Sequence, residues 1–314
     1  MTEWRNWSGN VVAHPLRIAS PGDEAELSQV IAAASHVRVA GAGHSFTPLC
    51  DTDDTLVSLA EMAGDLMIAA DRRTIDAPAG WTLQRLTEAL WSEGLSLPNQ
   101  GDINSQSLAG ALGTGTHGTG RDLGSLSTLA EGFRLVTASG ETIECSRERN
   151  PDLFQAQRLS LGLLGVATRV RMRVMPAFHL EERIERRPLN QVLEGLDELA
   201  AATRHFEFFL FPYAKSVMLK TLHPCPPGGA LKPTRRDDVF QACCDLAAAA
   251  PRAVPMIQRT LTRQWRSSSR SGPAWRIFAA ERDVRFEEME YEVPVANAVA
   301  ALKAVLARIR AARM

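Results

Sequence analysis

The feature that most constrains this chain is a glycine-rich segment that follows directly on a short apolar run. The run is residues 37–39, and the segment reads A-G-A-G-H-S-F at residues 40–46. Two glycines let the backbone approach a bound group closely, and the next amides can point at the oxygens of a pyrophosphate. The imidazole of His44 stands between Gly43 and Ser45, where a nucleophile could bond such a group. The pattern predicts a strand that ends in a cofactor-binding loop.

A second glycine-rich stretch, G-T-G-T-H-G-T-G, occupies residues 113–120. It contains the spacing G-x-G-x-x-G, which in a nicotinamide-binding unit needs a strand before it and a long helix after it. Here S-L-A-G-A-L precedes at residues 107–112 and G-R-D-L-G follows at residues 120–124, so that unit is not expected. Threonines between the glycines suit a backbone that lies against a flat, polar cofactor and donates hydrogen bonds to it.

Length and composition are those of an ordinary soluble protein of about two domains. The 314 residues suffice for two cores, and the net charge of −1 gives no electrostatic argument for binding nucleic acid. The five cysteines show no paired spacing such as C-x-x-C. No apolar run approaches the ~18 residues of a membrane span. We therefore expect a cytoplasmic protein, and peripheral association with a membrane surface is left open.

Helix and strand signals divide the chain at about residue 176. Before this point, short apolar strands alternate with amphipathic helices, a pattern typical of mixed α and β packing around a sheet. Helices are expected at 24–34, started by residues 21–23, and from residue 82. Strands are expected at 37–40, 55–59, 133–137, 142–145 and 170–174, and a hairpin turn at 139–140 joins the third to the fourth. After it, we expect a helix at 188–204, strands at 206–211 and 288–293, and a helix from about residue 294.

Four motifs occur in an order that identifies a family. They are the segment at 40–46, N-Q-G-D at 99–102, G-T-H-G-T-G at 115–120 and S-L-G-L-L-G-V at 160–166. This order resembles the aldonolactone oxidoreductases of the vanillyl-alcohol-oxidase superfamily of flavoproteins, and residues 206–213 and 285–291 resemble their cap domain. The resemblance implies an α+β protein with a two-subdomain FAD-binding PCMH-type domain at residues 10–176. An incomplete α+β cap (substrate) domain follows at residues 177–314.

The resemblance also implies which residues bind FAD. His44 matches the histidine that bonds covalently to the flavin 8α carbon, a link that retains the cofactor and raises its potential. The other implied cofactor-binding residues are Gly41, Ala42, Gly43, Ser45, Gly115, Thr116, Gly118 and Thr119, with Asp102 and Val166 as further matches. Asp102 could equally cap a turn, and Val166 could equally belong to the core.

No catalytic residue is assigned from the sequence. His117 lies in the second glycine stretch, where we expect its ring nitrogens to orient the loop rather than to transfer a proton. The seven histidines are scattered, and none pairs with a cysteine or an aspartate at ligand spacing. We therefore expect no metal site.

The activity that the resemblance implies is oxidation of a sugar-1,4-lactone, such as gulono- or arabinono-1,4-lactone, at its C2 hydroxyl. The flavin N5 takes the hydride, and the electrons pass to O2 or another acceptor. Family members usually continue past this point with a Glu-x-Arg strand and a His-Trp-x-Lys segment, so we expect a C-terminally truncated chain. Two alternatives stay open: a catalytically impaired FAD-binding remnant, and an enzyme similar to the alditol oxidases, which act on sugar alcohols.

Overall fold

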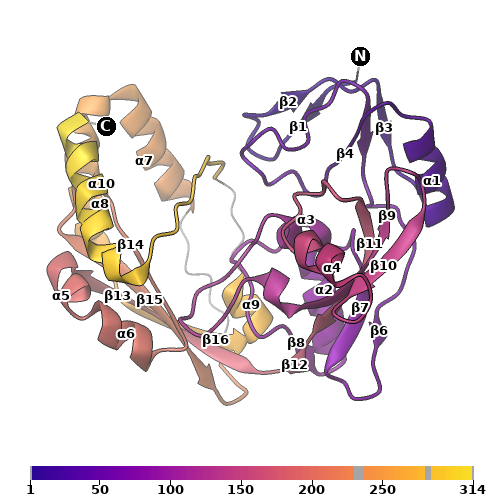
Figure 1. Ribbon diagram of the computed structural model, residues 1–314. Helices are drawn as coiled ribbons and strands as arrows, with labels where there is room; N and C mark the ends of the chain where they lie inside the picture. The colour runs from indigo at the N-terminus through magenta and orange to yellow at the C-terminus, as the bar shows by residue number, and fades with distance from the viewer. Residues whose placement is uncertain (1, 230–236, 280–283, 313–314) are drawn as a thin grey trace.

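The chain forms two lobes in the computed structural model, which describes residues 2–229, 237–279 and 284–312 (Figure 1). The N-terminal lobe runs to Pro176, and the strand that begins at His179 enters the C-terminal lobe. Two buried apolar clusters lie in the first lobe and a third belongs mainly to the second. Among the described helices, none is both long enough and apolar enough to cross a membrane.

The first part of the N-terminal lobe is a small parallel sheet with helix α1 (Glu24–Ala32) against it. The helix begins as predicted, because the Asp23 side chain accepts a hydrogen bond from the amide of Glu26. Leu27 and Ile31 lie on its buried side. The sheet has the order β3-β5-β4. Its strands are β3 (Arg17–Ala19), β4 (Val37–Val39) and β5 (Thr55–Val57), and a separate ribbon joins β1 (Trp4–Arg5) to β2 (Val12–Ala13).

The second part of this lobe is an antiparallel sheet with the order β10-β9-β11-β7-β6. Its strands are β6 (Met67–Ile68), β7 (Thr74–Pro78), β9 (Ala130–Val136), β10 (Thr142–Ser146) and β11 (Val166–Arg173). β9 and β10 form the predicted hairpin. Around the sheet lie α2 (Leu83–Ser92), α3 (Leu108–Gly113), α4 (Pro151–Gln157), the 3-10 turn η1 (Leu126–Leu129) and the short pair β8 (Leu95–Ser96) and β12 (Met175–Pro176).

Glu24 joins the two parts of the N-terminal lobe. Its carboxylate accepts hydrogen bonds from Arg134 on β9 at 2.8 Å and from Thr168 on β11 at 2.6 Å. The Arg134 guanidinium holds the pKa of Glu24 below its usual range, against the opposing effect of burial. Val136 and Val166 of the antiparallel sheet also pack in one apolar cluster with α1. The two parts therefore share a core, and the space between their loops has a fixed shape.

The C-terminal lobe is a four-stranded antiparallel sheet with the order β14-β15-β13-β16. Its strands are β13 (His179–Pro188), β14 (His205–Phe209), β15 (Ser216–Cys225) and β16 (Ser268–Pro273). Helices α5 (Leu189–Glu194), α6 (Leu196–Ala202) and α8 (Val254–Gln264) contact these strands on the side away from the N-terminal lobe (Figure 1). The lobe also contains α7 (Asp237–Ala249), η2 (Pro251–Ala253), α9 (Ala274–Phe278), η3 (Val295–Asn297) and α10 (Ala298–Ala312).

Two expectations for this lobe were wrong. The helix expected at 188–204 is two helices, because Gly195 separates α5 from α6 and glycine is a weak helix former. The strand expected at 288–293 does not form, since no described strand pairs with it. Its alternating apolar residues have no buried face to occupy, and Tyr291 is 83% exposed. A strand is stabilised by pairing with another strand and by burial of one face. Alternating apolar residues in the sequence suggest a strand but provide neither the partner nor the burial.

Candidate functional site

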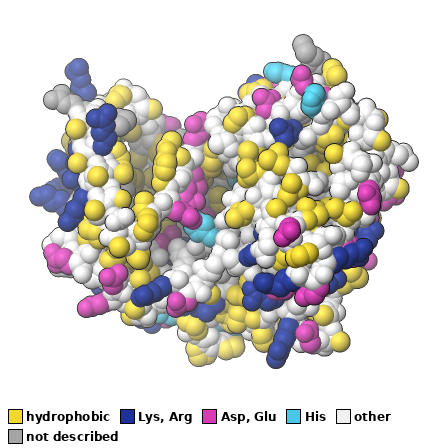
Figure 2. All heavy atoms as spheres, viewed as in Figure 1, with side chains coloured by type: hydrophobic (Ala, Val, Ile, Leu, Met, Phe, Trp, Pro, Cys, Tyr) yellow, Lys and Arg dark blue, Asp and Glu magenta, His cyan; other side chains and the backbone are white. Residues whose placement is uncertain are grey.

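A cavity of about 960 Å³ lies between the loops of the N-terminal lobe and the sheet of the C-terminal lobe. Figure 2 shows the molecule hollowed between the lobes, with acidic and histidine side chains gathered in the hollow. Its size is at the upper end of what small-molecule and cofactor sites occupy. All of the residues that the family resemblance implies for FAD binding line it: Gly41, Ala42, Gly43, His44, Ser45, Asp102, Gly115, Thr116, Gly118, Thr119 and Val166.

The first glycine loop is held against the start of α3. A β-carbon on Gly41 would lie 2.0 Å from the Ser107 hydroxyl, so a side chain there would displace the group that caps α3. Gly43 has a φ of +68°, a conformation that side chains rarely adopt. The Trp7 amide donates to the Gly43 carbonyl at 2.8 Å, and Asn6 donates to the carbonyl of Ser45 at 3.0 Å. The N-terminal segment thus fixes the loop from one side while its other side faces the cavity.

His44 is fixed in orientation and neutral. Its ring stacks on the Trp7 indole with centroids 4.8 Å apart, and its Nε2 lies 2.8 Å from the Ser105 hydroxyl. Nδ1 is buried and has no hydrogen-bond partner among the described residues. Burial lowers the pKa of His44, which favours the uncharged imidazole. With a proton on Nε2 donated to Ser105, the lone pair of Nδ1 is the free nucleophile.

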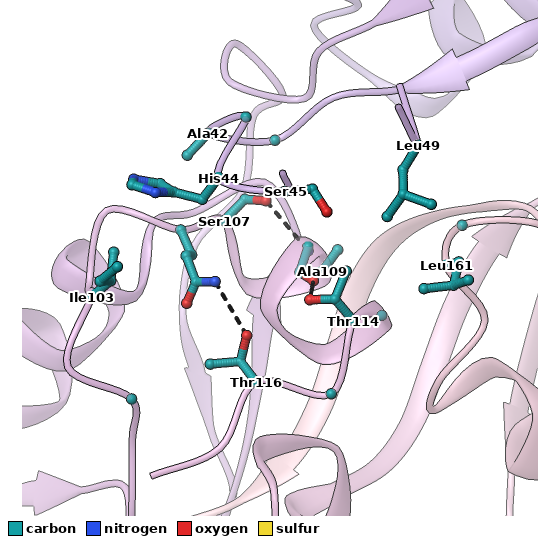
Figure 3. A pocket seen from close by; sticks show the side chains of 18 of the residues that line it. Ala42, His44, Ser45, Leu49, Ile103, Ser107, Ala109, Thr114, Thr116 and Leu161 are labelled. Carbon is teal, nitrogen blue, oxygen red and sulfur yellow. Dashed lines mark hydrogen bonds between the residues drawn. The ribbon is translucent and has the colours of Figure 1, made fainter. Parts of the chain in front are cut away.

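The second glycine loop follows α3 rather than a strand, which confirms that it is not a Rossmann fingerprint. Gln106 donates to the Thr116 hydroxyl at 3.2 Å, and Asn99 donates to the Thr119 carbonyl at 3.1 Å. A β-carbon on Gly118 would lie 2.3 Å from the Gln100 carbonyl oxygen. In Figure 3, Thr114 and Thr116 follow the end of α3, with His44 and Ser45 across its start. Both loops therefore present backbone to the same space.

Asp102 and Val166 also line the cavity, and for each of them the sequence leaves a purely structural role open. Val166 is the first residue of β11 and is 6% exposed in the cluster with α1, so it belongs to the core as well as to the cavity wall. Asp102 is half-buried and lies in no helix or strand. The role of both residues in holding a cofactor stays a prediction.

His117 contacts a residue that lies far away in the sequence. Its Nδ1 is 2.8 Å from the Gly118 carbonyl oxygen and its Nε2 is 2.8 Å from Glu290 Oε1, across 173 positions. Burial alone would lower the pKa of His117, but these hydrogen bonds and the charges of Glu290 and Glu292 raise it. Both ring nitrogens then donate, as the predicted orienting role requires.

The sequence predicted no metal site, and the His117 cluster is the place to test that expectation. The nearest ligand atoms of His117, Glu290 and Glu292 all lie within 4.8 Å of one another, and all three residues are exposed. Histidine and carboxylate groups are ligands for several metals. The ion pair between His117 and Glu290 already accounts for the contact, so the arrangement does not require an ion.

The wall that the C-terminal lobe contributes was missed from the sequence. Glu207 and Phe209 on β14, Lys220 and Leu222 on β15, and Phe278 at the end of α9 line the cavity opposite the glycine loops. A signal was present, because Glu207 is a charge inside the apolar run F-E-F-F at residues 206–209. The residue pattern predicted this strand, but it does not show which face of the strand meets another lobe.

Two family models cover most of the chain. Residues 15–146 match a FAD binding domain, and residues 170–314 match D-arabinono-1,4-lactone oxidase. The L-gulono-1,4-lactone dehydrogenase of Mycobacterium tuberculosis (strain ATCC 25618 / H37Rv) is 37% identical over 98% of this chain and 74% of its own length. The chain belongs to the aldonolactone oxidoreductase family. This confirms the family that the motif order indicated, and with it an FAD-linked oxidoreductase.

Further relatives agree on the family and the fold. L-gulonolactone oxidase of Scyliorhinus torazame is 36% identical over 68% of this chain, and the match spans 50% of that relative. The solved structure of cholesterol oxidase from Brevibacterium sterolicum superposes with a TM-score of 0.74 over 87% of this chain and 60% of that one. At 16% identity this likeness shows the fold alone, and it confirms the α+β FAD-binding PCMH-type architecture.

Proposed function

We propose that this protein holds FAD in the cavity through a covalent bond to His44 and oxidises the C2 hydroxyl of an aldono-1,4-lactone. The observation that carries the proposal is the buried Nδ1 of His44, which has no partner among the described residues. A buried polar atom without a hydrogen bond costs about 1–3 kcal/mol, and a bond from Nδ1 to a ligand in the adjoining cavity would remove that cost. The relatives named as lactone dehydrogenase and lactone oxidases supply the class of substrate.

The cavity fits this cofactor on its own evidence. Both glycine loops line the cavity, and Gly41 and Gly118 let them pack closely against Ser107 and Gln100. Glycine-rich backbone and threonine hydroxyls suit a pyrophosphate and a ribityl chain. When bound, FAD supplies a hydride acceptor, chemistry that no side chain has.

The protein's own residues prepare the attachment and the reaction space. In the tautomer whose Nε2–H donates to the Ser105 hydroxyl, Nδ1 is unprotonated, and Trp7 holds the ring in place. The strands β14 and β15 close the cavity from the other side with Glu207 and Lys220. A lactone bound there is enclosed between the two lobes. The proposal includes an electron acceptor, which is O2 or another compound. No described residue favours one of the two.

Acid denaturation of the purified protein tests the attachment. If the proposal holds, yellow colour and flavin fluorescence stay with the precipitated wild-type chain and are lost from His44→Ala. A flavin that dissociates from the wild type in acid contradicts the covalent bond but leaves FAD binding intact. A colourless wild-type protein contradicts the proposal as a whole.

Anaerobic addition of L-gulono-1,4-lactone tests the reaction. Bleaching of the oxidised flavin absorbance is expected, and D-arabinono-1,4-lactone and a sugar alcohol are tried beside it. Reduction by the sugar alcohol alone would replace the lactone proposal with polyol oxidation. Bound flavin that none of these compounds reduces would identify an FAD-binding protein without this activity.

A further inference from the structure

We propose that Lys220 and Glu207 form a recognition site for the sugar hydroxyls of the substrate, at the cavity end of a row of four charges that Glu182 and Arg270 complete away from the ligand. The inference rests on the proposed function, because it assigns the part of that cavity which binds an uncharged polyhydroxy lactone. Each of the four charges comes from a different strand of the C-terminal lobe. Only the fold brings these residues together, since they are up to 88 positions apart in sequence.

The four side chains form one row across the sheet. Glu207 on β14 pairs with Lys220 on β15, and Glu182 on β13 pairs with Arg270 on β16. Lys220 Nζ is 2.8 Å from Glu207 Oε1 and 3.8 Å from Glu182 Oε2. Glu182 pairs with Leu222, which is two residues from Lys220 and therefore on the same face of the sheet. Glu207 and Lys220 lie on the face that lines the cavity.

Three of the four side chains in the row are mostly buried, and Glu207 is about one third exposed. The exposed fraction of the side chain is 3% for Glu182, 13% for Lys220 and 15% for Arg270. Buried ion pairs are seldom better for stability than apolar residues of the same volume, because removing charges from water is expensive. The row is therefore weak evidence for stability, and at Lys220 and Glu207, where it reaches the cavity wall, it is stronger evidence for a ligand.

The two ends of the row differ in how many of their hydrogen-bonding groups are used within the protein. Arg270 donates to both oxygens of Glu182, at 2.8 and 3.0 Å, and also to the carbonyl of Ile277. That end is satisfied within the protein. At the other end, Lys220 forms an ion pair with Glu207 and its distance to Glu182 is too long for a hydrogen bond, so the ammonium keeps donors that the described residues do not use. Glu207 likewise keeps acceptor positions.

The free groups match a vicinal diol. An ammonium only donates and a carboxylate only accepts, whereas neighbouring hydroxyls on a sugar can do both. The row contains two cations and two carboxylates, so its formal charge cancels and it does not select a charged ligand. Phe209 and Leu222 flank the pair in the cavity lining and can pack against the carbon face of the ring.

The test measures how the rate of anaerobic flavin reduction saturates with L-gulono-1,4-lactone. For Lys220→Met we expect the half-saturating concentration to rise about tenfold or more, the loss typical of a hydrogen bond to a charged group. The limiting rate should change much less, and Lys220→Arg should recover most of the affinity. Arg270→Met is the matched control, because it breaks the same row at the end that faces no ligand. It should lower thermal stability and leave the half-saturating concentration as in the wild type.

Every outcome decides the inference. Equal saturation in Lys220→Met and the wild type overturns it and leaves the lactone activity standing. An equal rise in Arg270→Met and Lys220→Met also overturns it, because the row would then be structural. A wild-type flavin that no lactone reduces overturns the proposed function and the recognition site with it. Should Lys220→Met fail to fold, Glu207→Gln, which keeps the shape and removes the charge, is measured against the same Arg270→Met control.

Discussion

The Trp7 indole lies nearly flat on the His44 imidazole, with centroids 4.8 Å apart and planes inclined by 27°. The same tryptophan donates its amide to the Gly43 carbonyl and meets the Phe286 ring edge-on at 5.2 Å. Phe286 lies in the segment that leads into η3 and α10 of the C-terminal lobe. One residue near the chain start therefore couples the glycine loop, the histidine and the other lobe.

Replacing Trp7 should loosen His44 without removing it. A stacked aromatic pair contributes about 1 kcal/mol, which is about fivefold in the population of the held ring orientation. We expect Trp7→Ala to bind FAD but to carry less of it after acid precipitation, and Trp7→Phe to stay near the wild type. The measurement is the ratio of acid-stable to total flavin. Equal ratios in all three proteins would show that the stack plays no part in attachment.

A methyl group on Gly41 should weaken cofactor binding. Its β-carbon would lie 2.0 Å from the Ser107 hydroxyl, so either this hydroxyl gives up its cap hydrogen bond to the Gly110 amide or the loop shifts. Gly22→Ala is the matched control, because there the nearest atom is the end of the Glu26 side chain at 3.5 Å. In a His44→Ala background, where no covalent bond can form, we expect Gly41→Ala to lose at least about tenfold in FAD affinity by fluorescence titration, a loss of about 1.4 kcal/mol. Retention of wild-type affinity would contradict the packing argument.

Local chemistry was what the sequence predicted best. The Asp23 cap, the β9 and β10 hairpin and both glycine loops follow from residues within a few positions of one another. The glycine loops also contain nearly all of the residues proposed to hold FAD. Here turn and cap preferences agree with the tertiary structure, which is why reading them locally succeeds.

Contacts between distant segments were not predictable in this way. Glu290 reaches His117 across 173 positions, and the charged row needs four strands in a defined register. Periodicity shows that a strand has two faces but not which of them a second lobe will cover. The unpaired segment at 288–293 is the same kind of failure, because alternation does not supply a partner strand. The break at Gly195 is a local effect, because glycine is a weak helix former.

Removing the Glu290 charge should lower the pKa of His117. The hydrogen bond and charge of Glu290 help to raise this pKa above its ordinary value against the opposing effect of burial. The protonated pair therefore contributes most at low pH and its contribution is lost as pH rises through the folded-state pKa. NMR titration of the imidazole should show a clear drop in Glu290→Gln and a smaller one in Glu292→Gln, which acts through charge alone. An unchanged titration in Glu290→Gln would refute the contact.

His205 should make the fold sensitive to acid. It is 1% exposed, its Nδ1 lies 2.9 Å from the Thr119 carbonyl oxygen, and its Nε2 has no partner among the described residues. Burial lowers the pKa of His205 to about 4, helped by the charges of Arg204 and Lys220. Because the folded-state value lies below the ordinary value of about 6.5, the unfolded chain binds more protons between these two values. Stability is therefore complete above about pH 6.5 and falls as the pH drops toward 4.

Urea unfolding at pH 7.5 and pH 5 measures this effect. With the pKa of His205 at about 4 in the folded protein, the histidine accounts for a loss of about 2 kcal/mol between the two conditions. His205→Asn retains a donor for the Thr119 carbonyl but cannot titrate, so its loss of stability between pH 7.5 and pH 5 should be smaller by about that amount. The difference between wild type and variant at pH 7.5, where His205 is neutral in both states, reports the packing change separately. Equal pH dependence in both proteins would mean that His205 is solvated when protonated, and the junction between β14 and the second glycine loop would then have to open in acid.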